Sequence, residues 1–168
     1  MHRYKVFNGA MPTTAALAPV TTGITIKTML QLATPSTRQI QLISWGYSLN
    51  DLPGADSNIE LIQTDVAATV TAHVASGVQP LDPNAPPSLL TLGAAATGYT
   101  ASAEGVTTAT RLFDQITFGT GAGEVELKYF YQWMPDERPI IAVSKFLRVR
   151  ATTPTSAVDM ICWICYDE

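Results

Sequence analysis

The run VDMICWICYDE at positions 158–168 is the stretch from which the fold is best argued. Alternate side chains of a β-strand point to opposite faces, and here both sets are apolar. One set comprises Met160, Cys162, Ile164 and Tyr166, and the other comprises Ile161, Trp163 and Cys165. A strand with two apolar faces must be covered on both sides. We therefore predict a central strand that packs one face into its own core and holds the other face against something else.

The composition indicates one globular domain that hides much of its surface. The chain has 168 residues, enough to bury a core in a single domain spanning 1–168. Only 14% of the residues are charged, whereas ~25% is ordinary, and 46% are hydrophobic. This balance favours burial in an assembly, although a surface rich in Thr and Ser would serve as well. The net charge of −4, with no basic cluster, argues against nucleic acid as a direct partner.

The sequence also bears on the compartment. No stretch is long and apolar enough for a membrane span, which takes ~20 residues. Residues 1–5 lead into no apolar segment of a secretion signal. We therefore expect synthesis in a cytoplasm and no membrane association. Cys162 and Cys165 then fit free, buried thiols.

Short alternating segments separated by Pro- and Gly-containing turns predict an all-β chain. The segments 24–33 and 38–48 are expected to pair as antiparallel neighbours. No internal repeat is present, so we predict an antiparallel β-sandwich of the jelly-roll type. An immunoglobulin-like sandwich is the alternative, but it lacks support because both cysteines lie on one strand. The expected strands are 2–7, 24–33, 38–48, 58–65, 66–75, 111–118, 124–133, 140–143, 146–151 and 158–166.

Two segments lack a strand pattern. Residues 1–23 comprise the first strand and an extended N-terminal arm, which is expected either to drape over something or to form an ordinary long loop. Residues 76–109 read as a long loop rich in Pro, Ala and Thr, a length usually associated with function or with contact to a partner.

Several polar side chains are expected to point outward. Gln31 lies on the polar side of its strand, and Arg148 and Arg150 share the polar side of theirs. The two arginines are expected to pair with Glu124 and Glu126 on a neighbouring strand, or with acids of a partner.

Residues that could carry chemistry are few. The C-x-x-C of Cys162 and Cys165 places the thiols on opposite faces of a strand, and a zinc site needs two further ligands. His2 and His73 are the histidines of the chain, and His73 has no carboxylate partner in its own segment. We therefore predict no catalytic residues, no metal site and no cofactor, and a protein that is not an enzyme.

A resemblance to a known family rests on five segments. They are RPIIAV (138–143), FLRVR (146–150), the terminal strand 158–166, IELIQTD (59–65) and the Pro-rich LDPNAPP (81–87). Their layout resembles the head decoration (cement) proteins of tailed bacteriophages with a jelly-roll fold. The resemblance implies homotrimers on the outside of an icosahedral capsid, where they clamp subunits of the major capsid protein. It also implies localisation to the virion surface.

The candidate interface follows from the arm and from the terminal strand. It comprises Pro12, Leu17 and Pro19 of the arm, with Trp163, Cys165 and Tyr166 of the terminal strand. One alternative function is a phage tail or fibre protein that binds a host glycan, which predicts exposed aromatic side chains at a shallow groove. A cupin-like enzyme would need a His-x-His motif, which this sequence does not contain.

Overall fold

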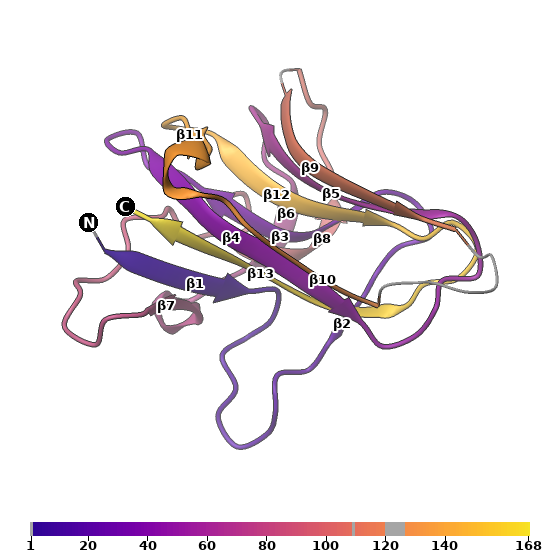
Figure 1. The fold of residues 1–168 in the computed structure, drawn as a ribbon. Coiled ribbons are helices and arrows are strands. Elements are labelled where there is room, and N and C mark those ends of the chain that lie inside the picture. Colours follow the sequence, from indigo (N-terminus) through magenta and orange to yellow (C-terminus); the bar gives the residue numbers. More distant parts are fainter. Residues whose placement is uncertain (1, 109, 120–126) are drawn as a thin grey trace.

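The computed structural model describes residues 2–108, 110–119 and 127–168, which form two packed antiparallel β-sheets (Figure 1). The predicted all-β sandwich is therefore confirmed. The first sheet has the order β10 (Lys128–Gln132), β4 (Ile40–Leu49), β13 (Asp159–Asp167), β1 (Arg3–Phe7) and β7 (Val78–Pro80). The second has the order β6 (Thr69–Ala72), β8 (Gly98–Ala103), β3 (Lys27–Ala33), β12 (Phe146–Thr152), β5 (Ser57–Thr64) and β9 (Thr110–Phe118).

Short elements complete the two layers. On the first sheet β11 (Ile140–Ile141) pairs with β4, and β2 (Val20–Thr21) pairs with β13. Two 3₁₀ turns, η1 (Ala75–Gly77) and η2 (Pro135–Glu137), precede β7 and β11. The pairs β3–β12, β4–β10 and β5–β9 nest within one another along the chain and alternate between the sheets, the pattern of a jelly roll.

The expected pairing of residues 24–33 with 38–48 is wrong, because β3 and β4 lie in different sheets. Both strands still face the same core, where Leu30 and Leu32 of β3 and Leu42 and Trp45 of β4 are fully buried. A strand's alternation fixes which of its faces is buried. It does not fix which strand lies beside it, because two sheets share one core.

The terminal strand β13 is central, as predicted, and lies between β4 and β1. Its inward residues are fully buried, among them Cys162 and Ile164. On its other face Ile161 and Trp163 stay partly exposed to solvent. The prediction of one face in the core is confirmed, and the second face is described below.

The outward orientation predicted for Gln31 and Arg148 holds for direction, but their exposure is wrong: both side chains are fully buried. Distant segments cover this side of the second sheet. Gln31 accepts a hydrogen bond from Ala68 N–H (2.8 Å) and donates to the Ala96 carbonyl (2.6 Å). Arg148 donates to the carbonyl oxygens of Val66 and Glu104 and pairs with the Glu104 carboxylate. Sequence alternation could not reveal a cover that comes from elsewhere in the chain.

The partners predicted for the arginines are also different. Arg148 pairs with Glu104, and Arg150 donates from Nε to Glu60 Oε1 (2.6 Å). The predicted partners Glu124 and Glu126 lie outside the described residues.

The segment 76–109, expected to be one long loop, contains β7 and β8. The remaining loop closes one end of the sandwich, where Tyr4 Oη donates to the Pro86 carbonyl (2.7 Å). Ser88 Oγ lies 2.7 Å from Tyr166 Oη, and Leu89 N–H donates to Glu168 Oε1 (2.8 Å). The terminal strand is thereby fastened to this loop.

Asp114 of β9 joins the edges of the two sheets. Its Oδ2 accepts hydrogen bonds from Trp45 Nε1 (2.9 Å) and from Tyr129 Oη (2.8 Å). Burial and the Asp114 carboxylate raise the pKa of Tyr129, so the phenol keeps its proton and remains a donor. This contact fixes edge strand β10, which carries part of the candidate site.

Candidate functional site

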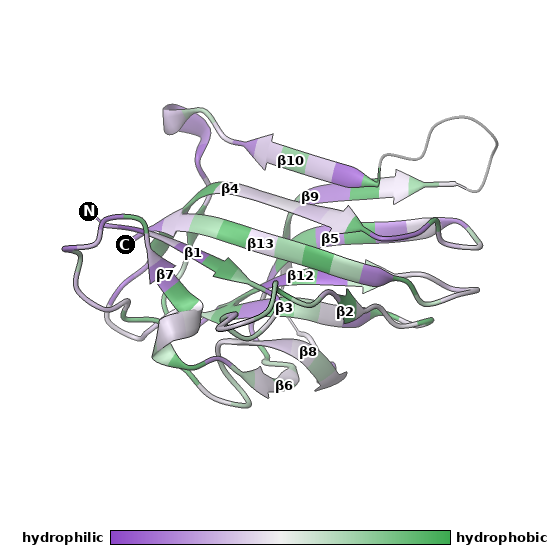
Figure 2. Ribbon diagram, turned by 90° about the horizontal axis from the view of Figure 1, so that it is seen from below, coloured by the Kyte–Doolittle hydropathy of each residue, from purple (hydrophilic) through white to green (hydrophobic). Residues whose placement is uncertain are grey.

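A row of aromatic side chains crosses the outer face of the first sheet, the face turned away from the second sheet. Phe7 of β1 lies opposite Trp163 of β13, Trp163 lies opposite Gly46 of β4, and Gly46 lies opposite Phe130 of β10. We call Phe7, Trp163 and Phe130 the aromatic row. Figure 2 shows this sheet in front, with β13 between β1 and β4.

Gly46 is the residue that lets the row lie flat. A Cβ at this position would lie 2.6 Å from the Tyr129 carbonyl oxygen and 2.9 Å from Cζ2 of Trp163. The indole therefore occupies the space that a side chain on β4 would need. Its ring lies 5.5 Å from that of Phe130, at an interplanar angle of 35°.

The outer ring faces carry a positive charge at one end of the row. Lys5 Nζ lies 4.1 Å from the Trp163 ring centroid and 4.9 Å from that of Phe7. These are cation–π distances, which orient the two rings. Phe130 at the other end is 58% exposed, a large apolar surface in contact with solvent.

The N-terminal arm leaves the sheet beside the row. The side chain of Asn8 prolongs the pairing of β1, because Nδ2 donates to the Met160 carbonyl and Oδ1 accepts from Cys162 N–H, both at 2.9 Å. Residues 9–19 then project from the sandwich before β2 returns to pair with β13 (Figure 1). A Cβ at Gly9 would lie 2.9 Å from Leu17 Cδ1, so glycine allows the close approach of the two ends of the arm.

A groove of about 400 Å³ separates the arm from the outer face. Through Phe7 it is continuous with the aromatic row. The predicted interface residues Pro12, Leu17 and Trp163 therefore belong to one surface. Pro19 lines a second groove, on the side of the arm that meets Tyr99. The lining of the first groove is Phe7, Gly9, Ala10, Met11, Pro12, Leu17, Gly77, Gln79 and Ile161.

Two of the predicted interface residues do not reach the surface. Tyr166 belongs to the inward set of β13, is fully buried and stacks on Tyr4 with 5.6 Å between ring centroids. Cys165 is on the outer face but is buried there by its neighbours, among them Ser44, and burial raises the pKa of its thiol. Neither side chain can contact a partner of the folded chain, so these two assignments are wrong.

Sequence reasoning missed Phe7, Gly46 and Phe130 as parts of this surface. A signal for Phe130 was present, because it shares the polar side of its strand with Lys128 and Gln132. An aromatic residue among polar positions indicates an exposed ring. The role of Gly46 could not be foreseen, since it depends on the register between β4 and β13.

The groups considered for chemistry have structural partners. His73 is buried, its Nε2 lies 2.8 Å from the Phe7 carbonyl oxygen, and its ring packs on Tyr99. Burial lowers the pKa of His73 and raises that of the Cys162 thiol. Within residues 2–108, 110–119 and 127–168, no group of three His, Cys, Asp or Glu side chains is arranged to hold a metal ion. Among these residues there is also no helix long and apolar enough to cross a bilayer.

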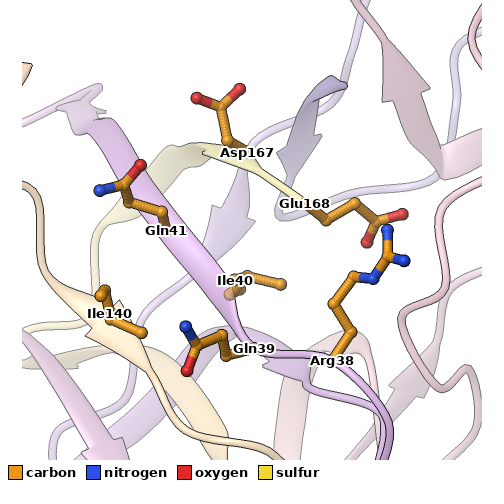
Figure 3. Close-up of a pocket in the computed structure, with 7 residues that line it drawn as sticks. All are labelled: Arg38, Gln39, Ile40, Gln41, Ile140, Asp167 and Glu168. Atoms are coloured by element: carbon orange, nitrogen blue, oxygen red, sulfur yellow. The ribbon is translucent and has the colours of Figure 1, made fainter. Parts of the chain in front are cut away.

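A second concave site lies at the end of the sandwich, with a volume of about 460 Å³ (Figure 3). Its buried carboxylate, Asp167, lies 3.3 Å from Arg3 Nε and 3.4 Å from Arg138 Nη1. Its lining residues are Arg38, Gln39, Ile40, Gln41, Ile140, Asp167 and Glu168.

In comparisons with known proteins, no family model, no curated protein and no solved structure matches this chain.

Proposed function

We propose that this chain is a structural subunit of a virion, a capsid decoration protein that assembles on the outside of a phage head and clamps major capsid subunits. The observation that carries the proposal is the coincidence of the arm, the groove and the aromatic row on one outer face. The homotrimeric state and the capsid partner come from the resemblance of the sequence to decoration proteins.

The chemistry of the outer face is that of an interface centre. Such centres are enriched in aromatic residues and Met, and poor in acids. Here Phe130 presents an exposed ring, and Met11 and Pro12 line the adjacent groove. Binding energy concentrates where an anchor side chain fills a neighbouring pocket. A groove beside exposed rings offers both parts.

The arm supports the same role. The side chains of residues 10–16 are exposed, and no backbone hydrogen bond joins residues 9–19 to the rest of the described chain. Such a segment can lie along a partner without unfolding the sandwich. A standard interface buries ~1,600 Å² in total, and an arm together with a sheet face can supply one partner's share.

The test uses shells assembled without this protein. Purified protein is added to mature shells, which are then sedimented and melted. We expect co-sedimentation and a raised melting temperature of the shell. Phe130→Ser should weaken both effects, whereas Leu112→Ser should not, because Leu112 is similarly exposed (53%) but lies on β9 of the second sheet. Shells that neither bind the protein nor gain stability contradict the proposal.

The exposed rings of β10 also fit the second candidate, a tail or fibre protein that binds a host glycan. Phe130 is 58% and Tyr131 40% exposed, and rings of this kind can stack on sugars. This role predicts binding to host cells that Phe130→Ser reduces, with no binding to shells. The shell assay and a cell-binding assay therefore separate the two candidates.

A further inference from the structure

The pocket at the end of the sandwich is separate from the outer-face groove and shares no lining residue with it. It lies where the loop before β4, the end of β13 and β11 meet (Figure 3). From its side chains we propose that it binds a neutral saccharide. This inference is independent of the shell role.

The pocket presents planar polar groups. The Gln39 and Gln41 amides each offer two donors and an acceptor, and the Arg38 guanidinium offers five donors. Each of these groups can hold two adjacent hydroxyls of a sugar at once, since their paired atoms have fork geometry. Figure 3 shows these side chains arranged around Ile40, with those of Arg38 and Glu168 extending toward one another.

Glu168 supplies a fixed acceptor. Its Oε1 accepts from Leu89 N–H (2.8 Å) and its Oε2 from Ser88 Oγ (3.1 Å). A carboxylate has about four acceptor sites, so capacity remains for a ligand hydroxyl. Because the loop already holds this side chain, little of its rotamer freedom is left to lose on binding.

The charges favour a neutral ligand. The Asp167 carboxylate is flanked by Arg3 and Arg138, at 3.3 and 3.4 Å. That leaves Arg38 and Glu168, one charge of each sign, at the rim. Neither an anion nor a cation would gain a strong net attraction.

The remaining lining is apolar. Ile140 is 43% exposed and offers a surface for the C–H groups of a sugar ring. The volume of about 460 Å³ lies in the range of small-molecule sites. The lining contains no aromatic ring for stacking, so we expect weak binding, with a Kd of about 1 mM.

The test is two-dimensional NMR of the full chain with lactose, maltose, chitobiose and 3′-sialyllactose as probes. At least one neutral sugar should shift the amide signals of Gln39, Gln41 and Glu168. Gln39→Ala combined with Gln41→Ala should raise its Kd at least tenfold. The matched control is Gln132→Ala, an exposed glutamine on β10, which should leave the Kd unchanged.

Three results would overturn the proposal. The first is no shift at these residues with any neutral sugar at ten times the expected Kd. The second is a shift that survives the double substitution in a variant whose spectrum shows it is folded. The third is binding of sialyllactose alone, abolished by salt, which would make the pocket an anion site.

Discussion

Replacing Arg148 by Met tests how the cover of the second sheet is fastened. The Arg148 side chain is fully buried and donates to the carbonyl oxygens of Val66 and Glu104. Met fills similar volume without the donors, so no large cavity is left. The change therefore reports on the polar contacts rather than on packing.

The magnitude follows from the groups that lose a partner. Two partly buried carbonyl oxygens each cost about 1 kcal/mol when a donor is removed. The Glu104 carboxylate loses its ion pair but is 22% exposed and still accepts two hydrogen bonds from Thr28, so we assign it about 1 kcal/mol. The sum is about 3 kcal/mol, at the lower edge of the range for breaking a fully buried pair.

Equilibrium unfolding in urea provides the measurement, with Arg150→Met as the matched control. Arg150 is on the same strand, but its ion pair with Glu60 is near the surface, so its loss should cost about 1 kcal/mol. We expect Arg148→Met to lower the urea midpoint by about 1.5 M. If Arg148→Met costs no more than Arg150→Met, the guanidinium does not hold the cover, and this reasoning fails.

Three further predictions concern the first sheet and the buried titratable groups. Gly46→Ala should destabilise the fold by about 1–3 kcal/mol and alter Trp163 fluorescence, because the new Cβ meets both the Tyr129 carbonyl and the indole; an unchanged spectrum and stability would contradict the packing described. Burial lowers the pKa of His73, so below about pH 6.5 the unfolded chain binds a proton that the folded chain resists; stability should be full above that pH and fall below it, and His73→Gln should flatten the dependence in urea unfolding, whereas an equal slope in both proteins would exclude His73 as the cause. Burial raises the thiol pKa of Cys162, so a thiol reagent should label it only after unfolding, and rapid labelling of the native protein would be the opposite result.

How far the sequence could predict this fold depends on the reach of each signal. Alternation is local, and it correctly assigned the inward residues of β13, such as Cys162 and Ile164. It said nothing of partners, so β3 and β4 were wrongly paired. It also misjudged the exposure of Gln31 and Arg148, because segments far away in the sequence cover them.

The candidate site shows the same limit. Pro12 and Leu17 could be singled out as part of an arm, and Trp163 as the outward residue of a strand. Their meeting on one surface depends on the return of β2 to β13, which no local pattern encodes. Tyr166 was misassigned although the alternation itself placed it in the same set as the core residues Cys162 and Ile164.

The central claim is that the outer face of the first sheet exists to be covered by other protein. The most direct measurement is the molar mass in solution by light scattering, over a range of concentrations, for the wild type, Phe130→Ser and Leu112→Ser. The account predicts about three times 18.0 kDa for the wild type and Leu112→Ser, and a shift toward 18.0 kDa for Phe130→Ser. A wild-type mass of 18.0 kDa at every concentration, or a trimer that Phe130→Ser leaves intact, would contradict it.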